Sequence, residues 1–174
     1  MGSEMCIRDS IYGGEDYDAS REQKGWNQIG FDDSHWRPVV VQEAPKGVLR
    51  PQMAAPVKIM ERCDIQKVTK LNAEQIASAS ISTKRTVDPS AFVLDMGQNL
   101  AGFPEITVRG KRGQKVTLIV AEALTDEGAC NQRQTGRQHY YEYTLKGEGD
   151  ETWHPRFSYY GFRYIQVAVS YTHL

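Results

Sequence analysis

Short segments in which apolar and polar residues alternate recur along this chain. Alternation with a period of two residues is typical of a β-strand that places one face in a core. The segments predicted as strands are Ile106–Val108, Lys115–Val120, Tyr140–Leu145 and Phe162–Val167, with weaker ones at Val39–Val41, Val57–Met60 and Gln66–Leu71. Only Asn72–Ala79 has the composition of a helix, and it offers little apolar face to bury. Many short strands with Gly-rich turns predict an all-β fold, an antiparallel β-sandwich of the jelly-roll kind.

One pair of these segments is predicted to form a hairpin. Ile106–Val108 and Lys115–Val120 are joined through Gly110–Gly113, a glycine-flanked basic turn. On this register one face of the hairpin is apolar, and its residues are Ile106, Val108, Val116, Leu118 and Val120.

The N-terminal third has a different pattern. Residues 25–36 hold two tryptophans among acidic and amide side chains, and prolines at 45, 51 and 56 interrupt any continuous strand. We place a domain boundary near Pro56, so that residues 11–56 form the C-terminal part of one β-sandwich domain and residues 57–168 form a second sandwich. A partial sandwich leaves an open edge and an uncovered apolar face, which predicts poor solubility for the isolated chain.

Both ends are interpreted as foreign to the fold. Met5–Ser10 and Val169–Leu174 resemble peptides that arise when sequencing-adapter DNA is translated. We therefore predict artefactual tails at residues 1–10 and 169–174 and leave them out of the fold argument. Ordinary frayed termini are the alternative.

Composition and charge exclude several classes of protein. With 40% apolar residues, 25% charged residues and a net charge of −1, the chain has the composition of a globular domain and no basic face for nucleic acid. No apolar run approaches the roughly 20 residues of a membrane span, so neither nucleic acid nor membrane is a predicted partner. The three cysteines, Cys6, Cys63 and Cys130, form no CxxC pair, which argues against a disulfide scaffold or a structural zinc site.

Aromatic residues interleaved with carboxylates near the N-terminus are a candidate carbohydrate-binding site. Aromatic faces contact the apolar side of a sugar ring, and carboxylates or amides bind its hydroxyls. The candidates are Tyr12, Glu15, Asp18, Trp26 and Trp36. The same oxygen-rich cluster could bind Ca²⁺. The alternative, which we favour, has both tryptophans in the sandwich core and the aspartates capping loop backbone.

Two further segments carry dense polar and aromatic patterns. Asp95, ahead of Gly97, is predicted to accept hydrogen bonds from local backbone N–H groups. Arg156 and Arg163 lie among aromatic residues, with Gly161 allowing a tight turn. Stacked arginines could form a ligand platform. We favour the other interpretation, a strand corner at an interface with a neighbouring domain.

Four motifs in order resemble bacterial α-L-rhamnosidases over residues 11–168. They are Ile11–Ala19, where Ser20 then stands in place of the family's usual Arg; Gly25–Trp36; Asp95–Gly102; and Pro155–Tyr164. The family-motif and domain-interface residues are Asp95, Gly97, Gln98, Asn99, Gly102, Arg156, Gly161, Phe162, Arg163 and Tyr164.

The resemblance implies a concanavalin-like β-sandwich from a bacterial parent enzyme, with a periplasmic or secreted location favoured. That parent would hydrolyse terminal α-L-rhamnosides of glycans with inversion. Its acid and base would lie in an (α/α)₆ barrel C-terminal to this region, so no residue here is assigned a catalytic role. We predict a non-catalytic fragment whose partners are that barrel and a rhamnose-containing glycan. The alternatives are an autonomous rhamnose-binding module and a purely structural, adhesin-like sandwich.

Overall fold

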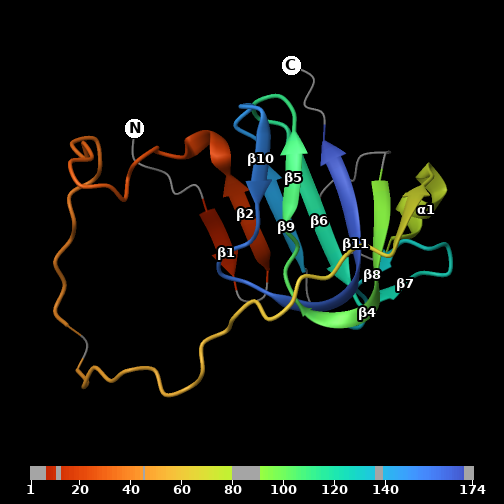
Figure 1. The fold of residues 1–174 in the computed structure, drawn as a ribbon, viewed down its shortest axis with the longest axis horizontal. Coiled ribbons are helices and arrows are strands. Elements are labelled where there is room, and N and C mark those ends of the chain that lie inside the picture. The colour runs from red at the N-terminus through yellow and green to blue at the C-terminus, as the bar shows by residue number, and fades with distance from the viewer. Residues whose placement is uncertain (1–6, 11–12, 45, 80–90, 136–138, 171–174) are drawn as a thin grey trace. The chain divides into compact units, whose positions relative to one another are not determined.

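The computed structural model describes residues 7–10, 13–44, 46–79, 91–135 and 139–170 (Figure 1). These residues divide into two compact units, residues 23–62 and residues 7–22 together with 63–170. Tyr12 and Cys6, two residues named above, lie outside the described part of the chain.

The unit of residues 23–62 consists of turns and extended chain, without a helix or strand in its described residues. The strands predicted at Val39–Val41 and Val57–Met60 are therefore wrong. These valines are exposed, Val39 by 88% and Val57 by 75%, so their apolar runs neither enter a core nor find a partner strand. Three valines after Pro38, and Val57 and Ile59 after Pro56, have a high strand propensity, but they have no sheet to join here.

The other unit is built on a seven-stranded sheet. Its strand order is β1-β2-β9-β6-β11-β4-β3. Its bounds are β1 Ile7–Ser10, β2 Gly14–Asp18, β3 Lys67–Leu71, β4 Ala91–Gly102, β6 Lys115–Ala121, β9 Tyr140–Thr144 and β11 Tyr160–Ser170. Every neighbouring pair is antiparallel except β2 and β9, which are parallel. The all-β sandwich predicted from the sequence is confirmed, and so are the strands predicted near residues 66–71, 140–145 and 162–167.

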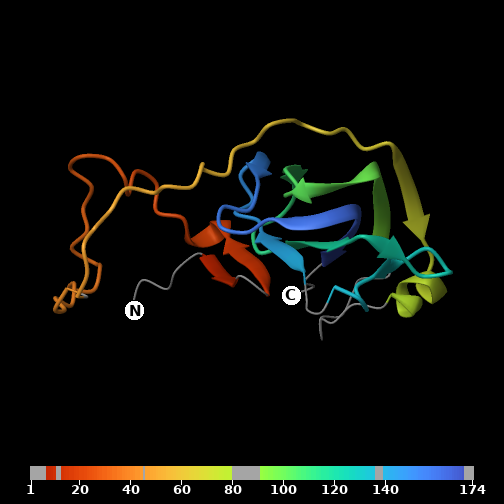
Figure 2. The ribbon, with the colours of Figure 1, turned by 90° about the horizontal axis from the view of Figure 1, so that it is seen from below.

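A second, two-stranded sheet pairs β5 (Ile106–Arg109) with β10 (Asp150–Trp153) and covers part of one face of the large sheet (Figures 1 and 2). The hairpin predicted between Ile106–Val108 and Lys115–Val120 is wrong, because β6 pairs instead with β9 and β11. Gly110–Gly113 carries the chain from one sheet to the other. The five apolar residues assigned to one face do share one core, which they line from both sheets. Alternation determines which face is apolar and leaves the pairing partner open.

The main core lies between the two sheets and is rich in aromatic side chains, among them Tyr17, Tyr141, Tyr143, Trp153 and Phe162. Two smaller clusters occupy the opposite face of the large sheet, where Leu71, Val93 and Ile119 are buried. A short hairpin of β7 (Ala123–Leu124) and β8 (Cys130–Asn131) and the helix α1 (Ala73–Ser78) pack there. The predicted helix is confirmed, and Asn72 and Gln75 close its N-terminus with a capping box.

The two structural units divide the chain differently from the boundary predicted near Pro56. Gly14–Asp18, on the N-terminal side of that boundary, belongs to the same sheet as β9. Ile7–Ser10 pairs with β2, and β11 extends to Ser170. The adapter interpretation concerns the origin of the two ends and stays a prediction.

Candidate functional site

The two motif segments richest in glycine, amide and aromatic residues meet where β4 pairs with β11. Asp95 Oδ1 accepts hydrogen bonds from Gly97 N at 2.7 Å and from Arg163 Nε at 2.9 Å, and Arg163 Nη2 donates to Oδ2 at 3.0 Å. The predicted role of Asp95 as a local backbone acceptor is confirmed. Its two-pronged ion pair with Arg163, 68 residues away, was not predicted. We name Asp95, Gly97 and Arg163 the bulge cluster.

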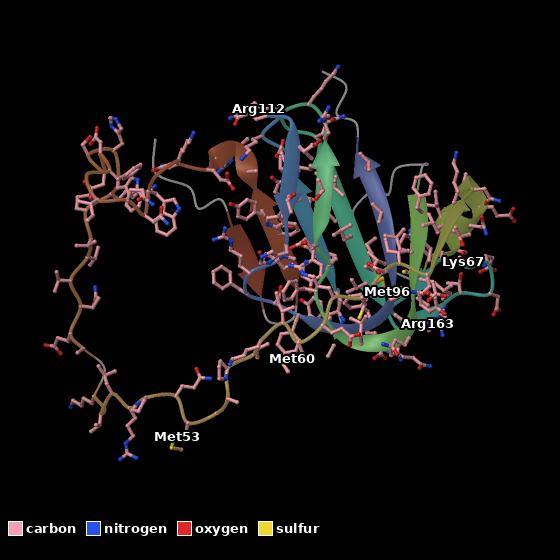
Figure 3. All side chains as sticks on the ribbon, viewed as in Figure 1. Met53, Met60, Lys67, Met96, Arg112 and Arg163 are labelled. Carbon is pink, nitrogen blue, oxygen red and sulfur yellow. The ribbon has the colours of Figure 1, made fainter. Side chains whose placement is uncertain are left out.

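The backbone at this point departs from a regular strand. The β4–β11 register shifts between Phe162 and Tyr164, and Gly97 has φ +82°, a conformation that disfavours side chains with a Cβ. Arg163 also lies over the Tyr164 ring, 5.0 Å from its centroid. Figure 3 labels Arg163 near Lys67 and Met96, on the three strands that flank the bulge.

Electrostatics hold this cluster in its charged form. The Arg163 guanidinium lowers the pKa of the Asp95 carboxyl below its ordinary value, against the smaller opposing effect of burial. Asp95 in turn raises the pKa of Arg163. Gln98 and Asn99 beside the cluster are exposed, Gly102 is half-buried, Gly161 is exposed, and Phe162 is buried in the main core. The bulge cluster is a charged, hydrogen-bonded feature at the surface of the large sheet.

Glu15, a candidate sugar ligand from the sequence, is fully buried in β2. Its carboxylate accepts hydrogen bonds from Arg156 N at 3.1 Å, Phe157 N at 3.2 Å and Ser158 Oγ at 3.4 Å. The carboxylate thus fixes the loop between β10 and β11, whose side chains Phe157 and Tyr159 are 67% and 54% exposed. Glu15 shapes this loop from beneath and does not face solvent.

The remaining candidates near the N-terminus are divided between the two units. Trp26 and Trp36 belong to residues 23–62 and are 58% and 40% exposed, so their placement in the sandwich core is wrong. Trp36 Nε1 donates to Gln23 Oε1 at 2.6 Å. Asp18 belongs to the other unit, where its Oδ1 accepts from Ser20 N at 3.0 Å, a backbone cap as the favoured interpretation expected.

A pocket of about 190 Å³ opens beside β2, β9 and β10. Tyr17 and Glu22 form one wall, Tyr143 and Lys146 form another, and residues 150–154 with Arg156 form the rest. The rings of Tyr17 and Tyr143 are stacked with centroids 5.8 Å apart, and Trp153 packs against both. Sequence reasoning missed this pocket, because its walls come from three segments that are separate in the sequence.

One wall of the pocket is organised by the carboxylate of Glu151. It accepts hydrogen bonds from Tyr143 Oη at 2.8 Å, Lys146 N at 3.0 Å, Gly147 N at 2.8 Å and Glu148 N at 3.3 Å. Burial alone would raise the pKa of Glu151, but these donors together hold it below its ordinary value.

The described residues were searched for clusters of metal-binding side chains and for helices that could span a membrane. No three His, Cys, Asp or Glu side chains there lie close enough to hold a metal ion, so the Ca²⁺ site stays a prediction. No helix in that part of the chain is long and apolar enough to cross a bilayer.

Comparison with known proteins gives consistent matches along the chain. The model of the bacterial alpha-L-rhamnosidase concanavalin-like domain matches residues 85–173, and that of the alpha-L-rhamnosidase N-terminal domain matches residues 3–61. Among curated proteins, an alpha-L-rhamnosidase of Streptomyces avermitilis is 36% identical over 91% of this chain and 14% of its own length. One from Formosa agariphila is 31% identical over 92% of this chain and 16% of its own length.

Solved structures agree. The Streptomyces avermitilis alpha-L-rhamnosidase complexed with L-rhamnose superimposes with a TM-score of 0.73 at 36% identity, over 91% of this chain and 14% of that one. The alpha-L-rhamnosidase from Dictyoglumus thermophilum gives a TM-score of 0.68 at 33% identity, over 94% of this chain and 17% of that one. This chain therefore spans about one sixth or less of the length of the relatives it matches.

Proposed function

The chain belongs to the bacterial α-L-rhamnosidase family, and from that premise we propose that it is an accessory, non-catalytic β-sandwich portion of an enzyme that hydrolyses terminal α-L-rhamnosides in glycans. The observation that carries the proposal is the pattern of coverage: relatives match over nine tenths of this chain but over only 14 to 17% of their own length. Most of a rhamnosidase lies outside the matched region.

The chemistry of the acidic side chains supports an accessory role. Glycoside hydrolysis needs a pair of carboxyl groups, one of them a general acid with a raised pKa. Where the described part of this chain shifts the pKa of an acidic side chain, the shift is downward, at Asp32, Asp95, Glu127 and Glu151. Glu15 and Glu151 are engaged by the backbone of two loops. These carboxylates serve the architecture of the sandwich.

The uneven size of the two sheets supports contact with another part of a larger polypeptide. Strands lie about 4.8 Å apart, so a two-stranded sheet cannot cover the whole face of a seven-stranded one. On the face that carries the main core, Val68 of β3 is 59% exposed and Phe92 of β4 is 39% exposed. Leu94 and Val167 beside them are half-buried. Exposed apolar patches of this kind mark interaction surfaces.

Two adjacent residues of the edge strand provide a matched test of that contact. Val68 faces the main core's side of the sheet, paired with Leu94, whereas Thr69 faces the opposite side, paired with Val93. Both are exposed. We expect Val68→Asp to leave the stability of the 174-residue chain unchanged but to lower the stability of a polypeptide extended through the native gene. Thr69→Asp should be neutral in both. Equal effects of the two substitutions in the extended protein would contradict the contact.

The non-catalytic assignment is tested by hydrolysis of an aryl α-L-rhamnoside. We expect the 174-residue chain to release no more product than a heat-inactivated sample, and the polypeptide extended through the native gene to release it catalytically. Rhamnose release by the 174-residue chain alone would overturn the assignment. An inactive extended polypeptide would overturn the parent activity.

A further inference from the structure

The loop between β10 and β11 carries Phe157 and Tyr159, the most exposed aromatic side chains in the described part of its unit. Figure 1 draws this loop in blue between β10 and the start of β11. Large aromatic side chains gain more free energy from burial than most other residues do. Two such rings held in water on neighbouring positions therefore indicate a surface that a partner covers.

A buried carboxylate holds the backbone of this loop in place. Glu15 is fully buried and accepts hydrogen bonds from the N–H groups of Arg156 and Phe157 and from Ser158 Oγ. Burying a carboxylate is costly unless hydrogen bonds replace those it made with water, and these donors do so. The loop is thus fixed before a partner arrives, which reduces the entropy cost of docking.

The loop also presents a positive charge that is not neutralised within the described residues. Arg156 is exposed, and its guanidinium has no partner among them. Around the adjoining pocket, by contrast, Lys146 pairs with Glu22 at 3.4 Å and Asp150 pairs with Arg109 at 2.7 Å. A guanidinium binds a carboxylate through two parallel hydrogen bonds, so a carboxylate is the group that fits Arg156.

Composition and tethering indicate the kind of partner. Aromatic residues and arginine are enriched at the centres of protein–protein interfaces, and this loop combines both. More than four fifths of each matched relative lies outside the region that this chain covers. A surface within the same polypeptide meets the loop at an effective concentration in the millimolar range. A free ligand or a second copy of the chain must reach that concentration to compete.

We propose that residues 156–159 dock on a carboxylate-bearing surface elsewhere in the parent polypeptide. Arg156 pairs with the carboxylate, and the rings of Phe157 and Tyr159 are buried in the contact. The inference rests on the proposed function, because it takes the chain to be part of a larger enzyme. It adds the chemistry of the partner surface and assigns Glu15 as the residue that positions the loop.

This contact is separate from the one proposed for the exposed apolar patch at the edge of the large sheet. The loop ends at Tyr160, the first residue of β11, whereas Phe92 of the patch pairs with Val167 near the other end of that strand. At about 3.3 Å per residue, the two positions lie roughly 20 Å apart along β11. The sandwich is thus held to the rest of the polypeptide at two places.

Labelling of Arg156 with phenylglyoxal, followed by peptide mass spectrometry, tests the docking. We expect rapid labelling in the 174-residue chain and labelling about tenfold slower in a polypeptide extended through the native gene. This factor corresponds to an effective concentration of about 1 mM and an affinity of about 0.1 mM for so small a surface. Raising the ionic strength from about 0.05 to about 1 M should reduce the protection, because salt screens the ion pair.

Two substitutions at Phe157 form a matched pair. Phe157→Ser removes the ring at an exposed position, so the 174-residue chain should keep its circular dichroism spectrum. In the extended polypeptide it should reduce the protection of Arg156 to less than about twofold, because the apolar part of the contact is lost. Phe157→Tyr keeps the ring and should retain the protection.

Several outcomes overturn the proposal. Arg156 labelled equally fast in the extended polypeptide does so, and so does protection that Phe157→Ser leaves intact. In the 174-residue chain, protection that rises with protein concentration would assign the loop to a second copy, and protection by L-rhamnose at about 1 mM would assign it to a sugar. Labelling does not depend on turnover. Protection of Arg156 in an inactive extended polypeptide would therefore support the docking while overturning the parent activity.

Discussion

Glu151 is predicted to contribute more to the stability of this chain than any exposed carboxylate. Oε1 accepts from Gly147 N and Glu148 N, and Oε2 accepts from Lys146 N and the Tyr143 hydroxyl. In Glu151→Gln one oxygen becomes an NH₂ group that faces two donors, so two hydrogen bonds are lost and two weaken. Hydrogen bonds to a charged group contribute about 1.5 to 3 kcal/mol each, so the loss of two should cost about 3 to 6 kcal/mol. That is a large fraction of an ordinary domain's stability of about 5 to 15 kcal/mol.

The same residue predicts a dependence on pH. The pKa of Glu151 is lowered in the folded protein relative to the ordinary value of 4.5, so its stabilisation is complete above pH 4.5 and is lost as the pH falls through the folded-state pKa. Burial raises the pKa of the Tyr143 hydroxyl, which therefore stays a donor throughout. The difference between wild type and Glu151→Gln should be largest at neutral pH and should shrink below pH 4.5.

Urea unfolding followed by tryptophan fluorescence measures both effects. Glu148→Gln is the matched control: it lies in the same turn with an exposed side chain, and it should change the free energy of unfolding by less than about 0.5 kcal/mol. Equal costs for the two substitutions, or a Glu151→Gln cost that does not vary between pH 7 and acid, would refute the reasoning.

Three further predictions follow from single positions. Gly14→Ala should destabilise far more than Gly113→Ala as judged by thermal unfolding, because both glycines have positive φ but only a Cβ at Gly14 would lie 2.1 Å from a backbone oxygen of β9; equal losses would contradict this. Cys63 should react with a thiol reagent in the native state, whereas Cys130, buried and with its pKa raised to about 12, should react only on unfolding, as peptide mapping by mass spectrometry would show. Arg163→Lys should cost about 0.5 to 1 kcal/mol in urea unfolding, since lysine keeps the charge but cannot bridge both oxygens of its partly exposed partner; a cost above about 2 kcal/mol would show that the pair does more than hold the bulge.

The sequence predicts this fold best where a signal is local. The capping box of Asn72 and Gln75 and the alternation in β6, β9 and β11 depend on neighbours a few residues apart, and the elements they predict are present. Pairing depends on distant segments. The β5–β6 hairpin was the natural expectation from a glycine-flanked turn, yet β5 pairs with β10, because one apolar face can close a core from either sheet.

The candidate site shows the same limit. Asp95 followed by Gly97 predicts a turn acceptor, and that contact is present, whereas no local signal connects Asp95 with Arg163. In the local sequence nothing distinguishes Glu15 from an exposed acidic residue, yet its side chain is fully buried. The structure, and not the sequence, distinguishes a carboxylate that accepts hydrogen bonds from loop backbone from one that is free to bind a ligand.

The parallel pairing of β2 with β9 affects how the chain folds during synthesis. Glu15 pairs with Tyr141, 126 positions later (141 − 15), so at about 5 to 20 residues per second the ribosome needs roughly 6 to 25 s after making β2 to deliver β9. Through that interval β2 has β1 on one side and an open edge on the other. An open strand edge is prone to pair with other chains, so the nascent protein is exposed to aggregation at this stage. Slow synthesis should therefore lower the soluble yield of this sandwich.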